Sequence, residues 1–364
     1  MITPKTNTNK GQSLQDCKKY TLIKLSLDVH AKDIVIVRQI ENAVPQPPQK
    51  MSPEKFLTWA AKQSQQADEV KACYEAGPTG FWLARKLIEQ GIDCTVVRPC
   101  RLDAYGTRVK NDRTDALALA ERFDRFIAGN PKAVAKVRIP TLQEEQSRVQ
   151  SRQRGQIHRM RQSVAAMGRS LMLLHGHRAK GQWWIACHWD KLTEQLPTFL
   201  IEQLTALRET ALFLSEQLKK ADATLTREGN RKPRPKGAGA KTLEMIDREV
   251  CSWERFTNRK QIGSYSGLCG GVDASGNHHS DLPITKAGNR RLRKHLVEMA
   301  WRMVYWQPQS KLIQRWRHVL LNPKAHARSR KRAIIAVARR LLVDLWRWRT
   351  GRMSLKDLGW IEMA

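Results

Sequence analysis

Apolar residues in the first 140 positions fall into short runs that alternate between two periodicities. Residues 20–30 and 34–37 are apolar runs at hairpin distance, which predicts an antiparallel strand pair. Further runs predict three helices and two strands: residues 53–66, 81–90 and 112–128 for helices, 70–76 and 94–97 for strands. Strands that alternate with helices predict an α/β domain built on one sheet.

A helical periodicity begins after Pro140. Apolar residues repeat at alternating three- and four-residue steps in two stretches, which is typical of coiled-coil seams. The seams are Ile157, Met160, Val164, Met167, Leu171 and Leu174, then Leu204, Leu207, Ala211, Leu214, Leu218, Ala221 and Leu225. A Trp-rich interruption at residues 182–189 separates them. The pattern predicts a long helical hairpin, with three roles left open: a spacer, a dimerisation surface, or a basic rod along nucleic acid.

The remaining chain is basic and mainly helical, and it gives the fold class: α/β plus α. A Pro- and Gly-rich basic stretch predicts a linker before it, because such residues mark loops. The predicted parts are a disordered basic tail (1–19), a mixed-sheet domain (20–140), a coiled-coil hairpin (141–228), the linker (229–240), a mainly helical domain (241–350) and a tail (351–364).

Charge narrows the class of partner. The chain has 364 residues, with 65 Lys and Arg against 34 Asp and Glu, a formal net charge of +31. Because 41% of the residues are hydrophobic and interleaved with the basic ones, the charge coats folded domains. This excess is larger than an enzyme of small metabolites needs, and it suits neutralising the phosphates of a long polyanion.

Neither the membrane nor an oxidising compartment fits the sequence. No apolar run approaches the roughly 18 residues of a membrane span. The N-terminus lacks the apolar core of a signal peptide, and the seven cysteines are scattered without a CxxC pair. We therefore expect a cytoplasmic protein with reduced thiols.

Four acids are candidates for metal binding. Asp112 and Asp115 are spaced to lie on one face of a helix, and Asp28 and Glu75 stand at the ends of predicted strands. Taken singly, Asp112 could be an N-cap, Asp115 a helix-dipole acid, and the other two salt-bridge partners. Taken jointly, four acids at these places on one sheet favour a two-metal site for phosphodiester chemistry, and oxygen ligands suit Mg²⁺.

These acids, with the sequence Tyr74-Glu75-Ala76-Gly77-Pro78-Thr79-Gly80, resemble the DEDD transposases of bacterial insertion sequences. The resemblance implies an N-terminal RuvC-like domain of RNase H type, in which Asp28, Glu75, Asp112 and Asp115 bind Mg²⁺. It also implies a coiled-coil insertion between this domain and a C-terminal transposase domain.

A second motif region lies between residues 256 and 294. Its glycines indicate close backbone approach, and basic residues surround them, so the region predicts a phosphate-binding loop that leads into a basic helix. The candidate nucleic-acid-binding residues are Lys286, Asn289, Arg290, Arg291 and Arg293. Ser275 could simply donate a hydrogen bond to a phosphate.

The resemblance extends to Ser275-Gly276 and to residues 285–293, and it implies a sharper role for the serine. The matching serine of the family attacks a DNA phosphate and forms a covalent phosphoserine link. The site would be composite, because the metal held by the first domain activates the weak hydroxyl nucleophile. Ser264, Ser266 and Ser280 are neighbouring alternatives.

The residues and the resemblance together predict a Mg²⁺-dependent DNA transposase or recombinase. The resemblance adds a guide RNA encoded by the element and assembly as a homo-dimer or tetramer. Two alternatives remain: a structure-selective endonuclease that uses metal-activated water, and a non-catalytic nucleic-acid-binding scaffold.

Overall fold

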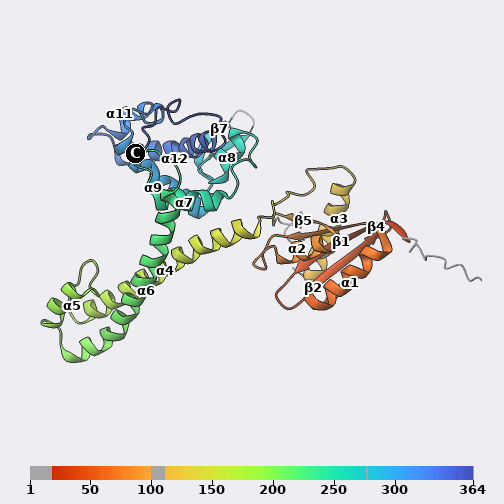
Figure 1. Ribbon diagram of the computed structural model, residues 1–364, viewed down its shortest axis with the longest axis horizontal. Coiled ribbons are helices and arrows are strands. Elements are labelled where there is room, and N and C mark those ends of the chain that lie inside the picture. The colour runs from red at the N-terminus through yellow and green to blue at the C-terminus, as the bar shows by residue number, and fades with distance from the viewer. Residues whose placement is uncertain (1–18, 100–110, 276–277, 364) are drawn as a thin grey trace, which may run out of the picture. The chain divides into compact units, whose positions relative to one another are not determined.

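The computed structural model describes residues 19–99, 111–275 and 278–363 (Figure 1). The chain divides after Pro140 into two compact units. The first unit is built on a five-stranded sheet with the order β3-β2-β1-β4-β5. The strands are β1 (Tyr20–Val29), β2 (Ile34–Ile40), β3 (Gln49–Met51), β4 (Ala67–Glu75) and β5 (Asp93–Val97). Pairs β1–β4 and β4–β5 are parallel, whereas β1–β2 and β2–β3 are antiparallel, so the predicted mixed α/β sheet is confirmed.

The two faces of this sheet are covered by different helices. On β1, Ile23, Leu25 and Leu27 pack in one core with helices α1 (Pro53–Gln66) and α2 (Trp82–Glu89). The opposite face packs against helix α3 (Asp112–Ile127), mainly through small and branched residues: Ala116, Ala120, Val35 and Val37. Because successive strand residues point to opposite faces, the even-numbered residues of β1 lie on the α3 side.

One of those even-numbered residues, Lys24, is almost fully buried. Its Nζ donates to the carbonyl oxygen of Glu41 at 2.8 Å and forms an ion pair with Asp124 of α3. The side chain of Lys24 is 5% exposed and that of Asp124 is 40% exposed. A buried ammonium needs such partners, so this pair fixes α3 to the central strand.

The second unit begins with helices α4 (Leu142–Leu174), α5 (Ala186–Thr193) and α6 (Thr198–Asn230). Five of the seven residues predicted for the α6 seam are buried: Leu204, Ala211, Leu214, Leu218 and Leu225. The predicted seam of α4 is wrong in part, because Met160, Met167 and Leu174 are exposed. Its buried positions include Ala165, Gly168 and Met172 instead.

The reason for this shift is Trp183, in the Trp-rich segment that looked like a mere interruption. Its indole Nε1 donates to the carbonyl oxygen of Ala165 at 3.0 Å. A Cβ added to Gly168 would lie 2.1 Å from the Trp183 ring, so only glycine fits there. The bulky indole therefore packs on the small-residue face of α4 and turns the larger apolar residues outward.

The rest of the second unit surrounds a separate core. Its elements are α7 (Ala240–Val250), α8 (Arg259–Tyr265), α9 (Arg290–Trp306), α10 (Lys311–Gln314), α11 (Arg317–Leu320) and α12 (Ala327–Arg349), with a hairpin of β6 (Gly270–Ser275) and β7 (His278–Ile284). The sequence did not predict this hairpin. Residues 351–364 were expected to form a tail. Instead, Leu355, Leu358 and Trp360 of this segment are buried in the same core. No helix within the described ranges is both long and apolar enough to cross a bilayer.

We predict that Asp124→Ala destabilises the first unit, because it leaves the buried Lys24 ammonium with one neutral acceptor. The expected loss is about 1–3 kcal/mol, the cost of an unsatisfied charged donor. Hydrogen exchange of the β1 amides measures it as the free energy of local opening. Glu121→Ala is the control, since Glu121 is an exposed acid on the same helix. Equal exchange in both variants would contradict the anchoring role of Lys24.

Candidate functional site

Two of the four predicted acids come together through the register of the sheet. Leu27 of β1 pairs with Tyr74 of the parallel strand β4, so Asp28 and Glu75 follow at the same end of adjacent strands. Cys73 belongs to the core between the sheet and α3, and residues two apart on a strand share a face, so Glu75 also lies on the α3 side. Both side chains are partly buried.

The other two acids lie in the first turn of α3. The N-cap is Asn111, whose Oδ1 accepts a hydrogen bond from the Arg113 amide at 3.1 Å. The alternative reading of Asp112 as the N-cap is therefore wrong. Because Asn111 satisfies the helix end, the carboxylates of Asp112 and Asp115 are not needed as caps.

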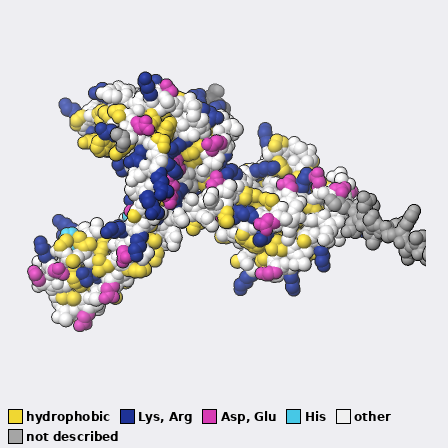
Figure 2. All heavy atoms as spheres, viewed as in Figure 1, with side chains coloured by type: hydrophobic (Ala, Val, Ile, Leu, Met, Phe, Trp, Pro, Cys, Tyr) yellow, Lys and Arg dark blue, Asp and Glu magenta, His cyan; other side chains and the backbone are white. Residues whose placement is uncertain are grey.

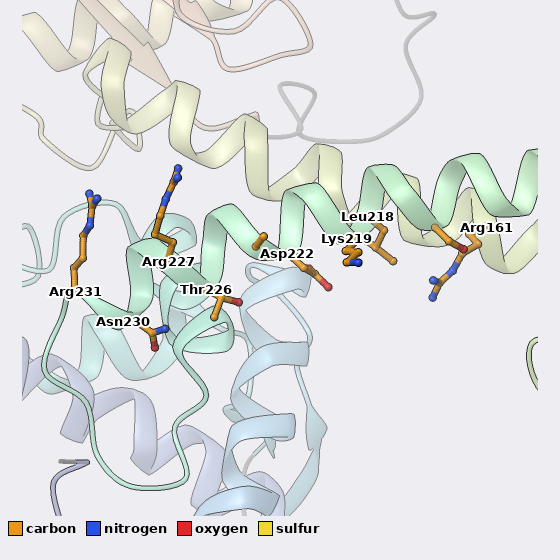
Figure 3. A pocket seen from close by; sticks show the side chains of 10 residues that line it. Arg161, Leu218, Lys219, Asp222, Thr226, Arg227, Asn230 and Arg231 are labelled. Carbon is orange, nitrogen blue, oxygen red and sulfur yellow. The ribbon is translucent and has the colours of Figure 1, made fainter. Parts of the chain in front are cut away.

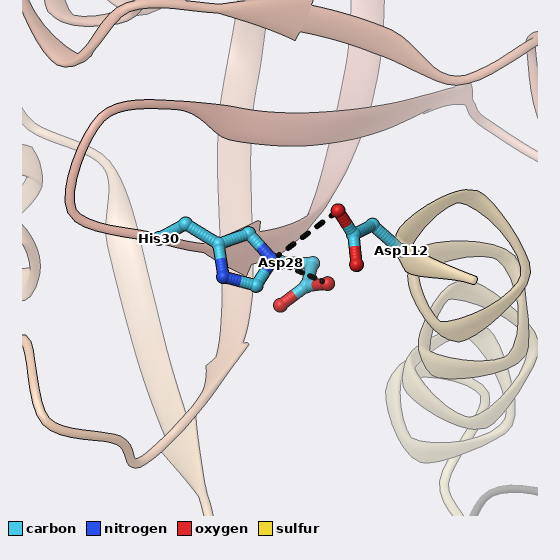
Figure 4. A group of neighbouring side chains, drawn as sticks. All are labelled: Asp28, His30 and Asp112. Carbon is cyan, nitrogen blue, oxygen red and sulfur yellow. Dashed lines mark hydrogen bonds and ion pairs between the residues drawn. The ribbon is translucent and has the colours of Figure 1, made fainter. Parts of the chain in front are cut away.

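A histidine that the sequence analysis missed lies between the two groups of acids. His30 Nε2 is 3.2 Å from Asp28 Oδ2 and 3.6 Å from Asp112 Oδ2 (Figure 4). These three side chains form a group that could hold a metal ion, with ligand atoms all within 4.8 Å of one another. The signal in the sequence was Asp28-Val29-His30, since residues two apart at a strand end can reach the same side.

The charges in this group oppose one another. Burial raises the pKa of Asp28, the His30 imidazole lowers it, and the carboxylates of Asp112 and Asp115 raise it again. The net effect is a pKa above the usual value, so ionised Asp28 is poorly compensated by the protein itself. A divalent cation supplies the missing compensation, and carboxylate oxygens with one imidazole fit Mg²⁺ or Mn²⁺.

The glycines of this region of the second unit do allow a close backbone approach, as predicted. The partner, however, is a neighbouring segment of the same region and not a phosphate. A Cβ on Gly288 would lie 2.6 Å from the Gly267 nitrogen and 2.6 Å from the Tyr265 carbonyl oxygen. The Asn289 amide donates to the Tyr265 carbonyl at 3.0 Å. Arg293 Nη1 donates to the Ser266 carbonyl at 2.7 Å. Gly288 and Arg293 thus join two segments of the chain.

Asn289 also has a structural position. Its Oδ1 accepts hydrogen bonds from the amides of Arg291 and Leu292 and caps α9, and its Nδ2 donates to Glu249 Oε2 at 2.7 Å. Glu249 is 1% exposed and receives a two-point hydrogen bond from Arg152. Burial alone would raise the pKa of Glu249, but these hydrogen bonds and the Arg152 charge hold it below the usual value.

The basic residues predicted to bind nucleic acid therefore separate into two groups. Lys286 and Arg290 are exposed, and Arg291 is half-buried. Burial lowers the pKa of the Arg291 guanidinium, and the nearby Arg152 charge lowers it further. The side chains of Asn289 and Arg293 are occupied within the fold, so they are less suited to contact a phosphate.

Ser275 is the last residue of β6. Its side chain, like Gly276, lies outside what the structure describes. Among its predicted alternatives, Ser266 is fully buried and Ser264 Oγ donates to the Gln261 carbonyl at 3.0 Å. Full burial makes Ser266 unsuited to attack a substrate. The nucleophile assignment to Ser275 stays a prediction.

Comparisons with known proteins agree on one family. The family model for transposases of the IS116/IS110/IS902 family matches residues 234–314. "Putative transposase y4rJ" of Sinorhizobium fredii is 30% identical over 304 residues, which cover 75% of each chain. "Putative transposase y4qE" of the same species is 28% identical over 306 residues. The transposase for insertion sequence element IS1111A of Coxiella burnetii is 25% identical over 252 residues, 64% of each chain.

We predict that Asp28→Asn stabilises the metal-free protein. The raised pKa means that the favourable contribution of protonated Asp28 is lost as the pH rises through that pKa, so at neutral pH its charge is a cost. In EDTA the variant should unfold roughly 2–4 °C higher than the unmodified chain, and the gain should shrink at acid pH.

The same substitution should remove stabilisation by a divalent ion. A bound ion at a hundredfold excess over its Kd stabilises by about 2.7 kcal/mol, which thermal unfolding in Mg²⁺ or Mn²⁺ detects. The control is Asp33→Asn, because Asp33 pairs with Lys50 at 3.0 Å outside the group of acids. A lower midpoint for Asp28→Asn in EDTA would refute the argument that ionised Asp28 destabilises the metal-free protein.

We predict that Asn289→Ala destabilises the second unit by about 2–3 kcal/mol, because it removes a helix cap and a partner of buried Glu249. The neighbouring Arg290→Ala should change stability by less than about 0.5 kcal/mol and weaken nucleic-acid binding. Urea unfolding and filter binding measure the two effects. Normal stability of Asn289→Ala with weakened binding would restore a direct nucleic-acid role for Asn289.

Proposed function

We propose that this chain, which belongs to the IS116/IS110/IS902 family of transposases, cuts and rejoins DNA in a divalent-metal-dependent reaction with Ser275 as the nucleophile. Transposases act on DNA, and the net charge of +31 suits a polyanionic substrate. The observation that most supports metal-dependent chemistry is the group formed by Asp28, His30 and Asp112, with Asp115 close enough to influence Asp28.

In this proposal Asp28, Glu75, Asp112 and Asp115 hold Mg²⁺, and His30 lies within reach of two of these ligands. The bound cation would polarise the scissile phosphate and favour the ionised form of an attacking hydroxyl. Without a cation, the carboxylates would also repel the phosphates of DNA from the site, because like charges repel. Metal dependence and substrate position would therefore be linked.

The proposed covalent step follows from the family resemblance of Ser275. Its Oγ attacks phosphorus and loses its proton to solvent, and a new Oγ–P bond forms. The bond from phosphorus to one bridging oxygen of the strand breaks, and that oxygen takes up a proton as it leaves. Attack by a second strand's hydroxyl reverses the step and rejoins DNA, so no external energy source is required.

Recognition of the DNA sequence would fall to an RNA encoded by the element. Base pairing then selects the target, while the protein binds the backbone and the shape of the strands. Exposed basic side chains of the second unit, such as Lys286 and Arg290, are compatible with this division. We further propose that the active form is a homo-dimer or tetramer.

We predict that Ser275→Ala abolishes a covalent protein–DNA adduct. The full chain is incubated with Mg²⁺, radiolabelled DNA of the element's ends and RNA transcribed from the element. A labelled protein band in a denaturing gel reports the adduct, and mass spectrometry of its peptides should place the phosphate on Ser275. Ser280→Ala, on strand β7, is the matched control and should keep the adduct.

Two results would redirect the proposal. Strand cleavage without any adduct would favour hydrolysis by metal-activated water, as in a structure-selective endonuclease. Full activity of Asp28→Ala and Asp112→Ala would contradict the proposed metal site, because each variant lacks one of the carboxylates that would hold the cation.

A further inference from the structure

A groove runs beside α6 in the second unit, away from every residue discussed so far as a site. Its volume is about 840 Å³. Four cationic side chains line it: Arg161 of α4 and Lys219, Arg227 and Arg231 on or next to α6 (Figure 3). In Figure 2, Lys and Arg side chains gather over this α6 stem.

None of these four cations forms an ion pair with a carboxylate of the described ranges, although the charge of Lys219 does lower the pKa of nearby Glu216. Lys220, the neighbour of Lys219, pairs with Glu216 at 2.7 Å. The acid in the groove, Asp222, is already occupied. Its Oδ1 accepts from Arg154 Nε at 2.7 Å and its Oδ2 from Lys241 Nζ at 2.9 Å. Asp222 is therefore paired with two cations that do not line the groove, and it forms no ion pair with the four that do.

The titration of a neighbouring histidine agrees with a positive local field. Burial lowers the pKa of His158, and the charges of Arg154, Arg161 and Lys294 lower it further. Cations that repel one another are stabilised by an anion placed among them. Among the described residues no acid forms an ion pair with these four cations, so an anion from outside would be stabilised there.

The lining and its length indicate the class of anion. Thr226 and Asn230 add hydrogen-bond donors. No aromatic residue is among those that line the groove, and Trp184, over whose ring Arg161 lies at 5.9 Å, is buried and cannot stack a base. Lys219 and Arg231 are twelve residue steps apart, and these steps span about 18 Å of helix. That length matches about five phosphates along a strand of a duplex, so a continuous polyanion fits better than a single phosphate.

We propose that this groove, defined by Arg161, Lys219, Arg227 and Arg231, binds the phosphodiester backbone of a nucleic acid without reading its bases. The inference rests on the proposed function, in which the chain acts on DNA with an RNA partner. It adds a location on the α4–α6 pair for backbone binding, distinct from the basic residues around Lys286 and Arg290.

The experiment measures the salt dependence of binding. Fluorescent 30-bp DNA and an RNA hairpin of similar length are titrated with the full chain from 0.1 to 0.4 M KCl. The test variant replaces Arg161, Lys219, Arg227 and Arg231 by Gln, which keeps helix propensity. The control replaces four exposed cations elsewhere by Gln: Lys62, Arg178, Lys180 and Lys191. Circular dichroism and thermal unfolding verify that both variants fold.

Loss of a phosphate contact reduces the slope of log K against log [KCl] by about 0.9. For the test variant we expect the slope to fall by about 3–4 with at least one probe, whereas the control should change it by less than 1. The probe that responds, DNA or RNA, identifies the source of the backbone. An unchanged slope with both probes, in a folded variant, overturns this inference and leaves the proposed function standing.

Two other outcomes are equally clear. Equal losses in the test and control variants would mean a diffuse ion atmosphere and would overturn the groove as a site. If the unmodified chain binds neither probe, the proposed function itself fails. A test variant that unfolds is replaced by the pair Arg227→Gln and Arg231→Gln, both exposed, for which the expected change in slope is about 2.

Discussion

The cost of bringing carboxylates together at a partly buried position is the constraint on which the first unit depends. Burial raises the pKa of Asp28, and the nearby carboxylates of Asp112 and Asp115 raise it further, so their approach has to be held by packing elsewhere. Helix α3 provides that hold through Ala116 and Ala120, which lie in the core against Val35 and Val37. The buried Lys24–Asp124 pair adds a charged anchor three turns along the same helix. The acidic group at the N-terminal end of α3 is destabilising, and the contacts made further along the same helix offset that destabilisation.

The second unit solves the opposite problem, an excess of cations. Buried or partly buried carboxylates each accept hydrogen bonds from two side chains: Glu249 from Arg152 and Asn289, Glu244 from Lys232 and Arg248, and Asp222 from Arg154 and Lys241. Breaking such a buried network is costly because it leaves an uncompensated charge. These acids are consumed by the fold, and the cations beyond their reach stay at the surface. One unit therefore gathers acids that suit a metal ion, and the other leaves cations that suit phosphates.

The buried face of an element could be predicted from the sequence where one side-chain periodicity governs packing. It could not be predicted where a single contact overrides that periodicity. The strands around Asp28 and Glu75 follow from alternation, and the buried face of α6 follows from its heptad spacing. The face of α4 could not be predicted, because the glycine at 168 admits an indole from a segment with no periodicity. Asn289 stood among basic residues and resembled a ligand for phosphate, yet its side-chain amide donates a hydrogen bond to Glu249, a buried acid forty residues away. His30 was missed because one histidine after an acid has no pattern until Asp112 arrives from another element.

Composition alone also could not separate the 65 basic residues into those that build the protein and those that contact a partner. The ion pairs seen in the structure distinguish these two groups of basic residues. Arg154 and Arg161 lie seven residues apart on α4 and look alike in the sequence, but Arg154 holds Asp222 and Arg161 lines the groove without a carboxylate. An arginine that satisfies a buried acid contributes to stability and is unavailable to a ligand, whereas an unpaired one raises the local potential and attracts a polyanion. In a chain this basic, surface function is decided less by where cations occur than by which of them the fold has left without an acid.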